Sequence, residues 1–175
     1  MRRQGFVDEV NNIMNDFKTA DLCDDFDAEL SILAPGFSNY GLRPRFCGKV
    51  STIKCVDDNS LVRDAVSSEG ESRVLVIDNA ASMRCAVLGD QLAELAVKNN
   101  WSGIIVNGCI RDSFDISAMD LGVKTLATHP LKTVKLGAGE RDVEVSFSGV
   151  TIQPGDYAYS DEDGIIIAKR PLLIP

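Results

Sequence analysis

The sequence predicts a mixed α/β domain with a βαβ unit in its middle and a β-rich C-terminal part. Two patterns predict it. Apolar strand-like runs flank a helical segment between residues 73 and 107, and short apolar runs separated by turns fill the last third. The chain of 175 residues matches the size of one domain with a hydrophobic core of its own.

The N-terminal third is predicted to be mostly helix and loop. Apolar residues three and four positions apart, from Phe6 to Phe17, indicate an amphipathic helix over residues 6–18. The elements expected after it are a short helix over 22–26, a loop with Pro35 and Pro44, a strand over 46–56 and a helix over 61–66. The polar turn Asp57-Asp58-Asn59 stands where the last of these helices would be capped.

The middle of the chain has the clearest pattern. Strands are expected over 73–78, 86–88 and 103–107, with a helix over 90–99 between the last two. A strand, a helix and a strand within about 25 residues are typical of a βαβ unit with parallel strands. Further strands are expected over 143–147, 150–152, 157–160 and 164–169. Trp101 is interpreted as a semi-buried anchor, and Asp161-Glu162-Asp163 as a solvated turn.

Composition and charge exclude several classes of protein. Lys and Arg number 18 against 26 Asp and Glu, a net charge of −8, which argues against direct nucleic-acid binding. No apolar run reaches the length of about 18 residues that a membrane span requires. The five cysteines are scattered, with no C-x-x-C pair, which indicates reduced thiols and a cytoplasmic location.

Candidate site residues follow two neighbouring strands of the βαβ unit. Gly89-Asp90-Gln91-Leu92 stands at the predicted helix start, and Arg111-Asp112 follows the next strand. Carboxyl ends of parallel strands meet at one edge of a sheet, where open α/β sheets bind ligands. The helix start and Arg111 are suited to a carboxylate, and Asp90 and Asp112 to a hard cation. The sequence therefore predicts a site for a metal and an anion.

Simpler interpretations remain open for these residues. Asp90 can be a helix N-cap, Asp112 can cap a short following helix, and Arg111 can be a solvated surface side chain. His129 is the only histidine, so one chain cannot form a two-histidine metal site, and a structural role is expected. Cys109 lies beside the predicted site but has no histidine next to it in sequence, so we interpret it as a packing residue.

Several segments also resemble a known family. The most specific are Gly89-Asp90-Gln91-Leu92-Ala93-Glu94-Leu95-Ala96 and the run from Trp101 to Asp112, with support from residues 37–41, 73–78, 127–130 and 155–156. From about Asp21 onward the chain resembles the regulator of ribonuclease activity A-like family, which includes the class II 4-hydroxy-4-methyl-2-oxoglutarate aldolases. Residues 1–20 would then be a helical extension and residues 21–175 the family domain.

The resemblance implies a single swivelling β/β/α domain that assembles as a homotrimer or a hexamer, with sites at subunit interfaces. It implies that the backbone amides of Gly89–Leu92 and the Arg111 side chain hold a small 2-oxo acid. Asp112 would carry a divalent cation, Mg²⁺ or Mn²⁺, and Asp90 would take part in proton transfer. Larger family members add an acid from a neighbouring chain in a C-terminal extension, and Glu140 is the residue expected to replace it here.

The resemblance also implies a reaction. The first expectation is metal-dependent cleavage of 4-hydroxy-4-methyl-2-oxoglutarate to pyruvate, with oxaloacetate decarboxylation as a companion activity. The alternative is a non-enzymatic regulator that binds and inhibits a ribonuclease. A Schiff-base aldolase is a third hypothesis, but it needs a lysine in the pocket, and neither site segment contains one.

Overall fold

The computed structural model describes residues 16–173. The helix predicted over 6–18 and the helical extension over 1–20 lie mostly outside these residues. The helical elements are α2 (Thr19–Phe26), a 3-10 turn η1 (Asp27–Glu29), α3 (Ser60–Val66), α4 (Asp90–Lys98) and α5 (Ser113–Ile116). No helix among residues 16–173 is long and apolar enough to cross a membrane.

One large mixed sheet organises the fold. Its strands are β1 (Leu30–Ile32), β2 (Ser38–Asn39), β3 (Phe46–Lys54), β4 (Val74–Asp78), β5 (Ala86–Leu88), β6 (Gly103–Ile110), β7 (Gly122–Thr128), β8 (Glu140–Arg141), β11 (Tyr157–Ser160) and β12 (Ile165–Ala168). The spatial order is β1-β12-β11-β3-β4-β6-β7-β2, and β5 and β8 pair with β6 and β3 respectively. Strands β3, β4, β6 and β7 run parallel, so their carboxyl ends share one edge.

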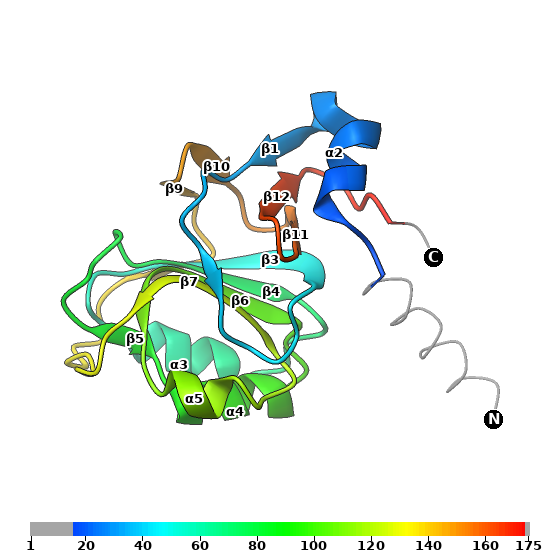
Figure 1. Cartoon of the computed structure of the whole chain (residues 1–175). Helices are drawn as coiled ribbons and strands as arrows, with labels where there is room; N and C mark the ends of the chain where they lie inside the picture. The colour runs from blue at the N-terminus through cyan, green and yellow to red at the C-terminus, as the bar shows by residue number, and fades with distance from the viewer. Residues whose placement is uncertain (1–15, 174–175) are drawn as a thin grey trace.

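The elements form three layers, as Figure 1 shows. Helices α3, α4 and α5 cover one face of the parallel strands, while β1, β11, β12 and the hairpin of β9 (Val145–Phe147) and β10 (Val150–Ile152) lie on the other side. One hydrophobic cluster, with Leu75 and Ile104, packs under the helices. A second, with Phe46 and Ile105, packs toward the β layer. This is the β/β/α arrangement expected from the family resemblance.

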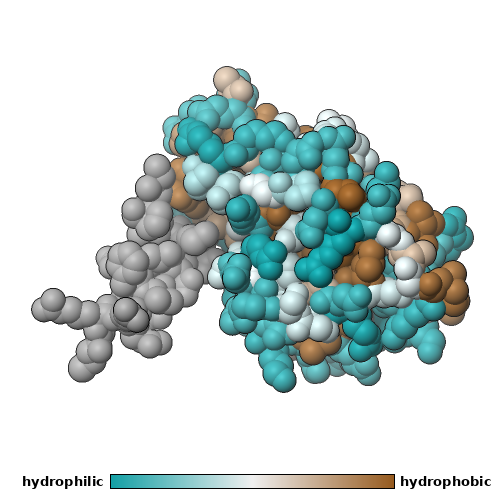
Figure 2. Space-filling view, turned by 180° about the vertical axis from the view of Figure 1, so that it is seen from behind, coloured by the Kyte–Doolittle hydropathy of each residue, from teal (hydrophilic) through white to brown (hydrophobic). Residues whose placement is uncertain are grey.

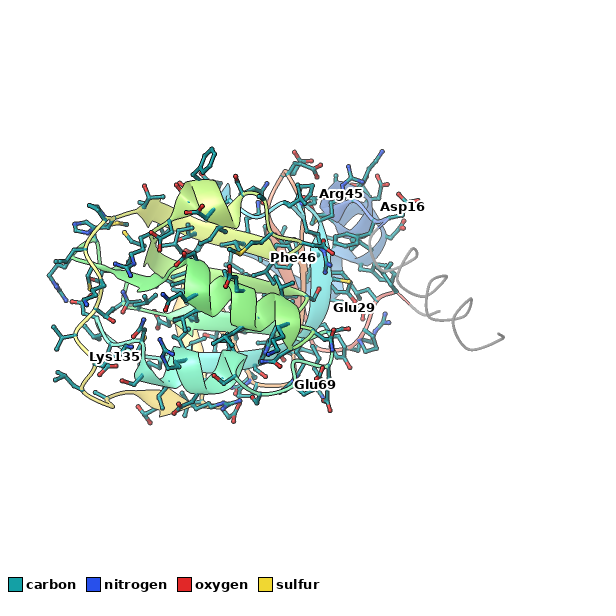
Figure 3. All side chains as sticks on the ribbon, turned by 90° about the horizontal axis from the view of Figure 1, so that it is seen from below. Asp16, Glu29, Arg45, Phe46, Glu69 and Lys135 are labelled. Atoms are coloured by element: carbon teal, nitrogen blue, oxygen red, sulfur yellow. The ribbon has the colours of Figure 1, made fainter. Side chains whose placement is uncertain are left out.

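Phe46 explains why two strands begin with glycine. A Cβ on Gly103 would lie 2.2 Å from the Phe46 ring, and a Cβ on Gly122 would lie 2.0 Å from it. Only glycine therefore lets β6 and β7 start beside this fully buried ring, which Figure 3 labels.

Most predicted elements are present with bounds shifted by a few residues, and the βαβ unit is β5-α4-β6. Two expectations about single residues were wrong. Asp161 is 2% exposed rather than solvated, because its carboxylate accepts hydrogen bonds from the Thr19 N–H and hydroxyl at 2.6 and 2.7 Å. Trp101 is 2% exposed rather than semi-buried, and its Nε1 donates to the Ser68 carbonyl.

Candidate active site

The carboxyl ends of β5 and β6 bring the two predicted site segments together. The Arg111 N–H donates to the Leu88 carbonyl at 2.9 Å, which fixes the end of β6 against the end of β5. Helix α4 begins directly after Gly89, so its first turn opens toward Arg111 and Asp112. The N–H groups in the first turn of a helix have no carbonyl partner within the helix, and the positive end of the helix dipole lies there. The edge is therefore suited to an anion.

Gly89 permits an unusually close approach between the two segments. A Cβ at this position would lie 2.8 Å from Asp112 Oδ2 and 3.2 Å from Arg111 Nε. The Asp90 N–H donates to the same Asp112 oxygen at 3.3 Å, and Arg111 Nε lies 3.4 Å from it. A larger side chain at position 89 would displace this arrangement.

Two cavities meet at Arg111. The first, of about 250 Å³, is lined by Asn59, Arg63, Ala86, Gly89, Asp90, Gln91, Leu92, Arg111, Lys132, Thr133 and Lys135. The second, of about 270 Å³, is lined by Arg111, Asp112, Ser113, Thr128, His129 and Pro130. Five of the six residues proposed from sequence thus line one cavity, and Asp112 lines its neighbour.

The structure decides between the simpler interpretations of these residues. Gly89 is the N-cap of α4, so Asp90 is not the cap; its Oδ1 accepts a hydrogen bond from the Gln91 N–H at 2.7 Å. Asp112 occupies the N-cap position of α5, but its side chain makes no capping hydrogen bond. The Arg111 side chain is 37% exposed and ion-paired with Asp112, so it is not a freely solvated arginine.

Three cations of the first cavity were not expected from sequence. Arg63 belongs to α3, and Lys132 and Lys135 belong to the loop after β7. Figure 3 shows Lys135 on this loop, at the end of the molecule beyond the helices. Neither of the two segments predicted from sequence contains a lysine, but the loop after β7 contributes two lysines to the cavity. The residues around these cations show no pattern that predicts a site, because hydrogen bonds to residues far away in the sequence hold the loop at the cavity.

Asp58 is the main anchor of this loop. Its Oδ2 accepts hydrogen bonds from the Leu136 N–H at 2.8 Å and the Ala138 N–H at 3.0 Å, while Oδ1 accepts from the Ser60 N–H and hydroxyl. Burial alone would raise the pKa of Asp58. The hydrogen bonds from Ser60, Ala138 and Leu136 outweigh it and lower the pKa from 3.8 to about 2. The predicted helix-capping turn therefore also holds a wall of the cavity.

The donor set at Asp112 fits Mg²⁺ or Mn²⁺ better than zinc. Among residues 16–173 no group of three His, Cys, Asp or Glu side chains converges, whereas a zinc site needs three or four protein ligands. Mg²⁺ keeps several waters and takes one or two carboxylates together with oxygens of its substrate. The Asp112 side chain is 33% exposed at the cavity rim, so it can supply one such carboxylate.

Three other residues considered from the sequence, His129, Cys109 and Glu140, contribute less to the candidate site. His129 Nδ1 accepts a hydrogen bond from the Leu131 N–H at 3.1 Å, which agrees with the structural role expected for it. Burial raises the pKa of the Cys109 thiol, in line with packing rather than nucleophilic chemistry. Glu140 is exposed in β8, paired in register with Lys54 at the carboxyl end of β3, and lines neither cavity.

Comparisons with known proteins identify the family of this chain. The model of the RraA-like family, described as Aldolase/RraA, matches residues 19–167. A protein of Laribacter hongkongensis named "Putative 4-hydroxy-4-methyl-2-oxoglutarate aldolase" is 56% identical over 158 residues, covering 90% of this chain and 99% of its own. A protein of the same name from Alkalilimnicola ehrlichii is 57% identical over 155 residues, covering 89% and 96%.

Solved structures with the same fold carry other names. One is described as an S-adenosylmethionine: 2-dimethylmenaquinone methyltransferase from Geobacillus kaustophilus, with a TM-score of 0.88, 44% identity and coverage of 90% of this chain and 98% of that one. Another is described as the RNA-processing inhibitor RraA from Thermus thermophilis, with a TM-score of 0.86, 37% identity and coverage of 89% and 94%. The fold is therefore shared by proteins with an enzymatic and with a regulatory description.

Proposed function

The chain belongs to the RraA-like (Aldolase/RraA) family, and from this premise we propose that it is a metal-dependent aldolase, a lyase that cleaves 4-hydroxy-4-methyl-2-oxoglutarate into two molecules of pyruvate. The names of relatives at 56% and 57% identity support this substrate. The observation that carries the proposal is the close approach of Gly89, Arg111 and Asp112, which would place a bound anion next to a carboxylate able to hold a cation. Decarboxylation of oxaloacetate is proposed as a second activity, because it also leaves a pyruvate enolate.

Each residue at the edge has a task in this reaction. The amides of the first turn of α4 and the Arg111 guanidinium bind and orient the carboxylate next to the 2-oxo group. Asp112 would hold Mg²⁺ or Mn²⁺ through its carboxylate. When bound, such an ion stabilises negative charge on the 2-oxo oxygen as a Lewis acid.

Asp90 moves the proton. The C4 hydroxyl loses its proton as the C3–C4 bond breaks, and the electron pair of that bond goes to the pyruvate enolate, which is then protonated at C3. Asp90 lies in the cavity beside Arg111, where its carboxylate can orient a water that carries this proton. In this proposal Asp90 and Arg111 are the catalytic residues.

The test is pyruvate release from 4-hydroxy-4-methyl-2-oxoglutarate and from oxaloacetate, with and without a chelator. We expect release that the chelator abolishes and that Mg²⁺ or Mn²⁺ restores. Because Lys132 and Lys135 line the cavity, borohydride reduction in the presence of substrate, followed by mass spectrometry, is the matched control. Full activity in excess chelator together with a reduced lysine adduct would establish a Schiff-base aldolase instead.

A second function is favoured by one comparison. A relative with a TM-score of 0.86 is described as an RNA-processing inhibitor, and the net charge of −8 suits binding to a basic protein surface rather than to RNA. A regulator of this kind would inhibit a ribonuclease without turning over any 2-oxo acid. The pyruvate assay, run beside a ribonuclease inhibition assay, separates the two functions.

A further inference from the structure

Strand β6 contains a β-bulge shortly before the candidate site. Between Val106 and Cys109, the register of β6 with β7 shifts by one residue. The two residues in between, Asn107 and Gly108, therefore lie opposite a single residue of β7. Such bulges are rare in parallel pairs of strands and over-represented next to active sites. Without the bulge, Arg111 would lie one residue further along β7, a displacement of about 3.3 Å.

The Thr125 hydroxyl holds the bulge from the side of β7. Thr125 is fully buried, and its Oγ1 donates a hydrogen bond to the Gly108 carbonyl at 2.7 Å. Its other acceptor, the Ala127 carbonyl, lies at 3.5 Å, so the bond to Gly108 is the stronger one. This side chain therefore ties β7 to the irregular part of β6 and not to the regular part.

The end of β4 and the residues after it hold the bulge from the opposite side. Asp78 Oδ1 accepts a hydrogen bond from Asn107 Nδ2 at 2.8 Å. The Asn107 carbonyl accepts from the N–H groups of Asn79 and Ala81, both at 3.2 Å. A Cβ on Gly108 would lie 3.0 Å from Asn79 Nδ2, so the two segments are in close contact. Polar contacts from both neighbouring strands thus fix the bulge in one position.

Two buried residues connect the bulge to Arg111. Cys109 and Ile110 are 1% and 0% exposed, and both are paired with β5 on one side and with β7 on the other. The Arg111 N–H then donates to the Leu88 carbonyl. Because these residues are close-packed and paired on both sides, a shift at the bulge moves the backbone of Arg111 as well.

We propose that Thr125 is a positioning residue for the reaction, since its hydroxyl holds the β6 bulge that sets the place of the Arg111 guanidinium. This inference rests on the proposed function, in which Arg111 binds the carboxylate of the substrate. Thr125, Asn107 and Asp78 line neither cavity, so they act only through Arg111. The bond between Asn107 and Asp78 has the same task from the side of β4.

The kinetic test uses two variants that differ in one hydroxyl. Thr125→Val removes the hydroxyl with little change of shape, and Thr125→Ser, the matched control, keeps it. We expect Thr125→Val to lower kcat/KM for pyruvate release by about 10- to 100-fold, an effect of the order caused by a 1 Å displacement. Thr125→Ser should stay close to the wild type.

A double-mutant cycle separates positioning from a general effect on the fold. In the Arg111→Ala background, Thr125→Val should cause no further loss, because its effect is exerted through Arg111. Wild-type kinetics in Thr125→Val, or a loss that multiplies with the loss in Arg111→Ala, overturns the inference.

An NMR measurement tests the positioning itself and needs no turnover. The Nε–H signal of Arg111 in isotope-labelled protein is identified by its absence in Arg111→Lys. We expect Thr125→Val to move this signal and Thr125→Ser to leave it in place. Asn107→Ala, which removes the bond to Asp78, should also move it and provides the test if Thr125→Val does not fold.

The two measurements make the outcomes distinguishable. If the Arg111 signal moves as expected but the wild type cleaves no substrate, the positioning is supported and only the proposed function fails. An unchanged Arg111 signal in a folded Thr125→Val or Asn107→Ala variant overturns the inference and leaves the aldolase proposal intact.

Discussion

Position 89 requires a residue without a side chain, because the candidate site leaves no space for one. The chain there has an ordinary extended conformation, with φ of −131°, so backbone strain does not require glycine. The requirement is space, because Arg111 and Asp112 approach to within the volume that a Cβ would fill. Substitution at this position therefore probes the site without disturbing the core.

We expect Gly89→Ala to lower kcat/KM for pyruvate release by about 100-fold, since displacement of reacting groups by about 1 Å has effects of that order. The melting temperature should change little. Gly164→Ala is the control, because no atom lies within 4 Å of a Cβ built there. Unchanged kinetics in Gly89→Ala would show that the close contact with Asp112 has no role in the reaction.

Asp112 combines a proposed ligand role with a rare backbone conformation. Its φ of 55° and ψ of 38° are left-handed, and asparagine tolerates this region far better than alanine does. Asp112→Asn thus removes the charge with little added strain. We expect the Mg²⁺ concentration for half-maximal activity to rise at least 10- to 100-fold, the range seen when even an outer partner of a metal ligand is lost. An unaltered metal requirement would assign the cation to another residue.

At the scale of elements, the loop after β7 depends on one carboxylate in the turn before α3. The pKa of Asp58 lies near 2, below its ordinary value of 3.8, so its ionised form stabilises the folded state. This stabilisation is complete above about pH 5 and is lost as the pH falls from about 5 through about 2. A shift of this size corresponds to about 2 kcal/mol.

Asp58→Asn should therefore lower the free energy of unfolding at pH 7 by about 2 kcal/mol and flatten its decrease below pH 4. Urea unfolding at pH 7 and pH 3, at a fixed protein concentration, measures both effects. Identical unfolding curves for the variant and the wild type would contradict the role given to Asp58.

Elements with a regular apolar pattern could be predicted from the sequence, and those held by polar contacts could not. The βαβ unit was predicted because β5, α4 and β6 carry apolar residues at strand and helix spacing. Strand β7 was missed because Lys124 and Thr125 interrupt its apolar pattern, although both are buried. Burial lowers the pKa of Lys124, and the Thr125 hydroxyl donates to the Gly108 carbonyl.

The candidate site also has one part that could be predicted from the sequence and one part that could not. Its first half, Gly89–Leu92 with Arg111 and Asp112, follows from the rule that parallel strands end at one edge. Its second half depends on hydrogen bonds between Asp58 and residues 78 and 80 positions away. A pattern within a single segment cannot reveal contacts of that range. Lys132 and Lys135 therefore looked like ordinary surface lysines in the sequence.

At the scale of the whole molecule, the loop that lines the cavity also exposes apolar side chains. Leu131, Val134 and Leu136 are 60%, 69% and 77% exposed. Figure 2 shows apolar atoms at the end of the molecule opposite the grey segment, where this loop lies in Figure 1. Groups of exposed apolar residues often mark interfaces between proteins. The surface formed by these three residues is therefore a candidate contact between copies.

We expect light scattering to show a homotrimer or a hexamer of the 19.0 kDa chain. Val134→Glu/Leu136→Glu should shift the assembly to smaller species with reduced activity, because charges would be buried at the interface. Asp115→Lys, a change on the exposed side of α5, serves as the control. A fully active monomer of the wild type would refute an assembly-dependent site.

Arg111 directly follows β6, pairs with Asp112 and borders both cavities. The central claim is that it holds the carboxylate of a 2-oxo acid. The most direct measurement is kcat/KM for pyruvate release from 4-hydroxy-4-methyl-2-oxoglutarate by Arg111→Ala and Arg111→Lys. Loss of one partner of a desolvated charge pair costs about 2–5 kcal/mol, so Arg111→Ala should lose roughly 30- to several-thousand-fold. Arg111→Lys should recover only part, since lysine lacks the planar fork. Wild-type kcat/KM in both variants would contradict the claim and favour the regulator.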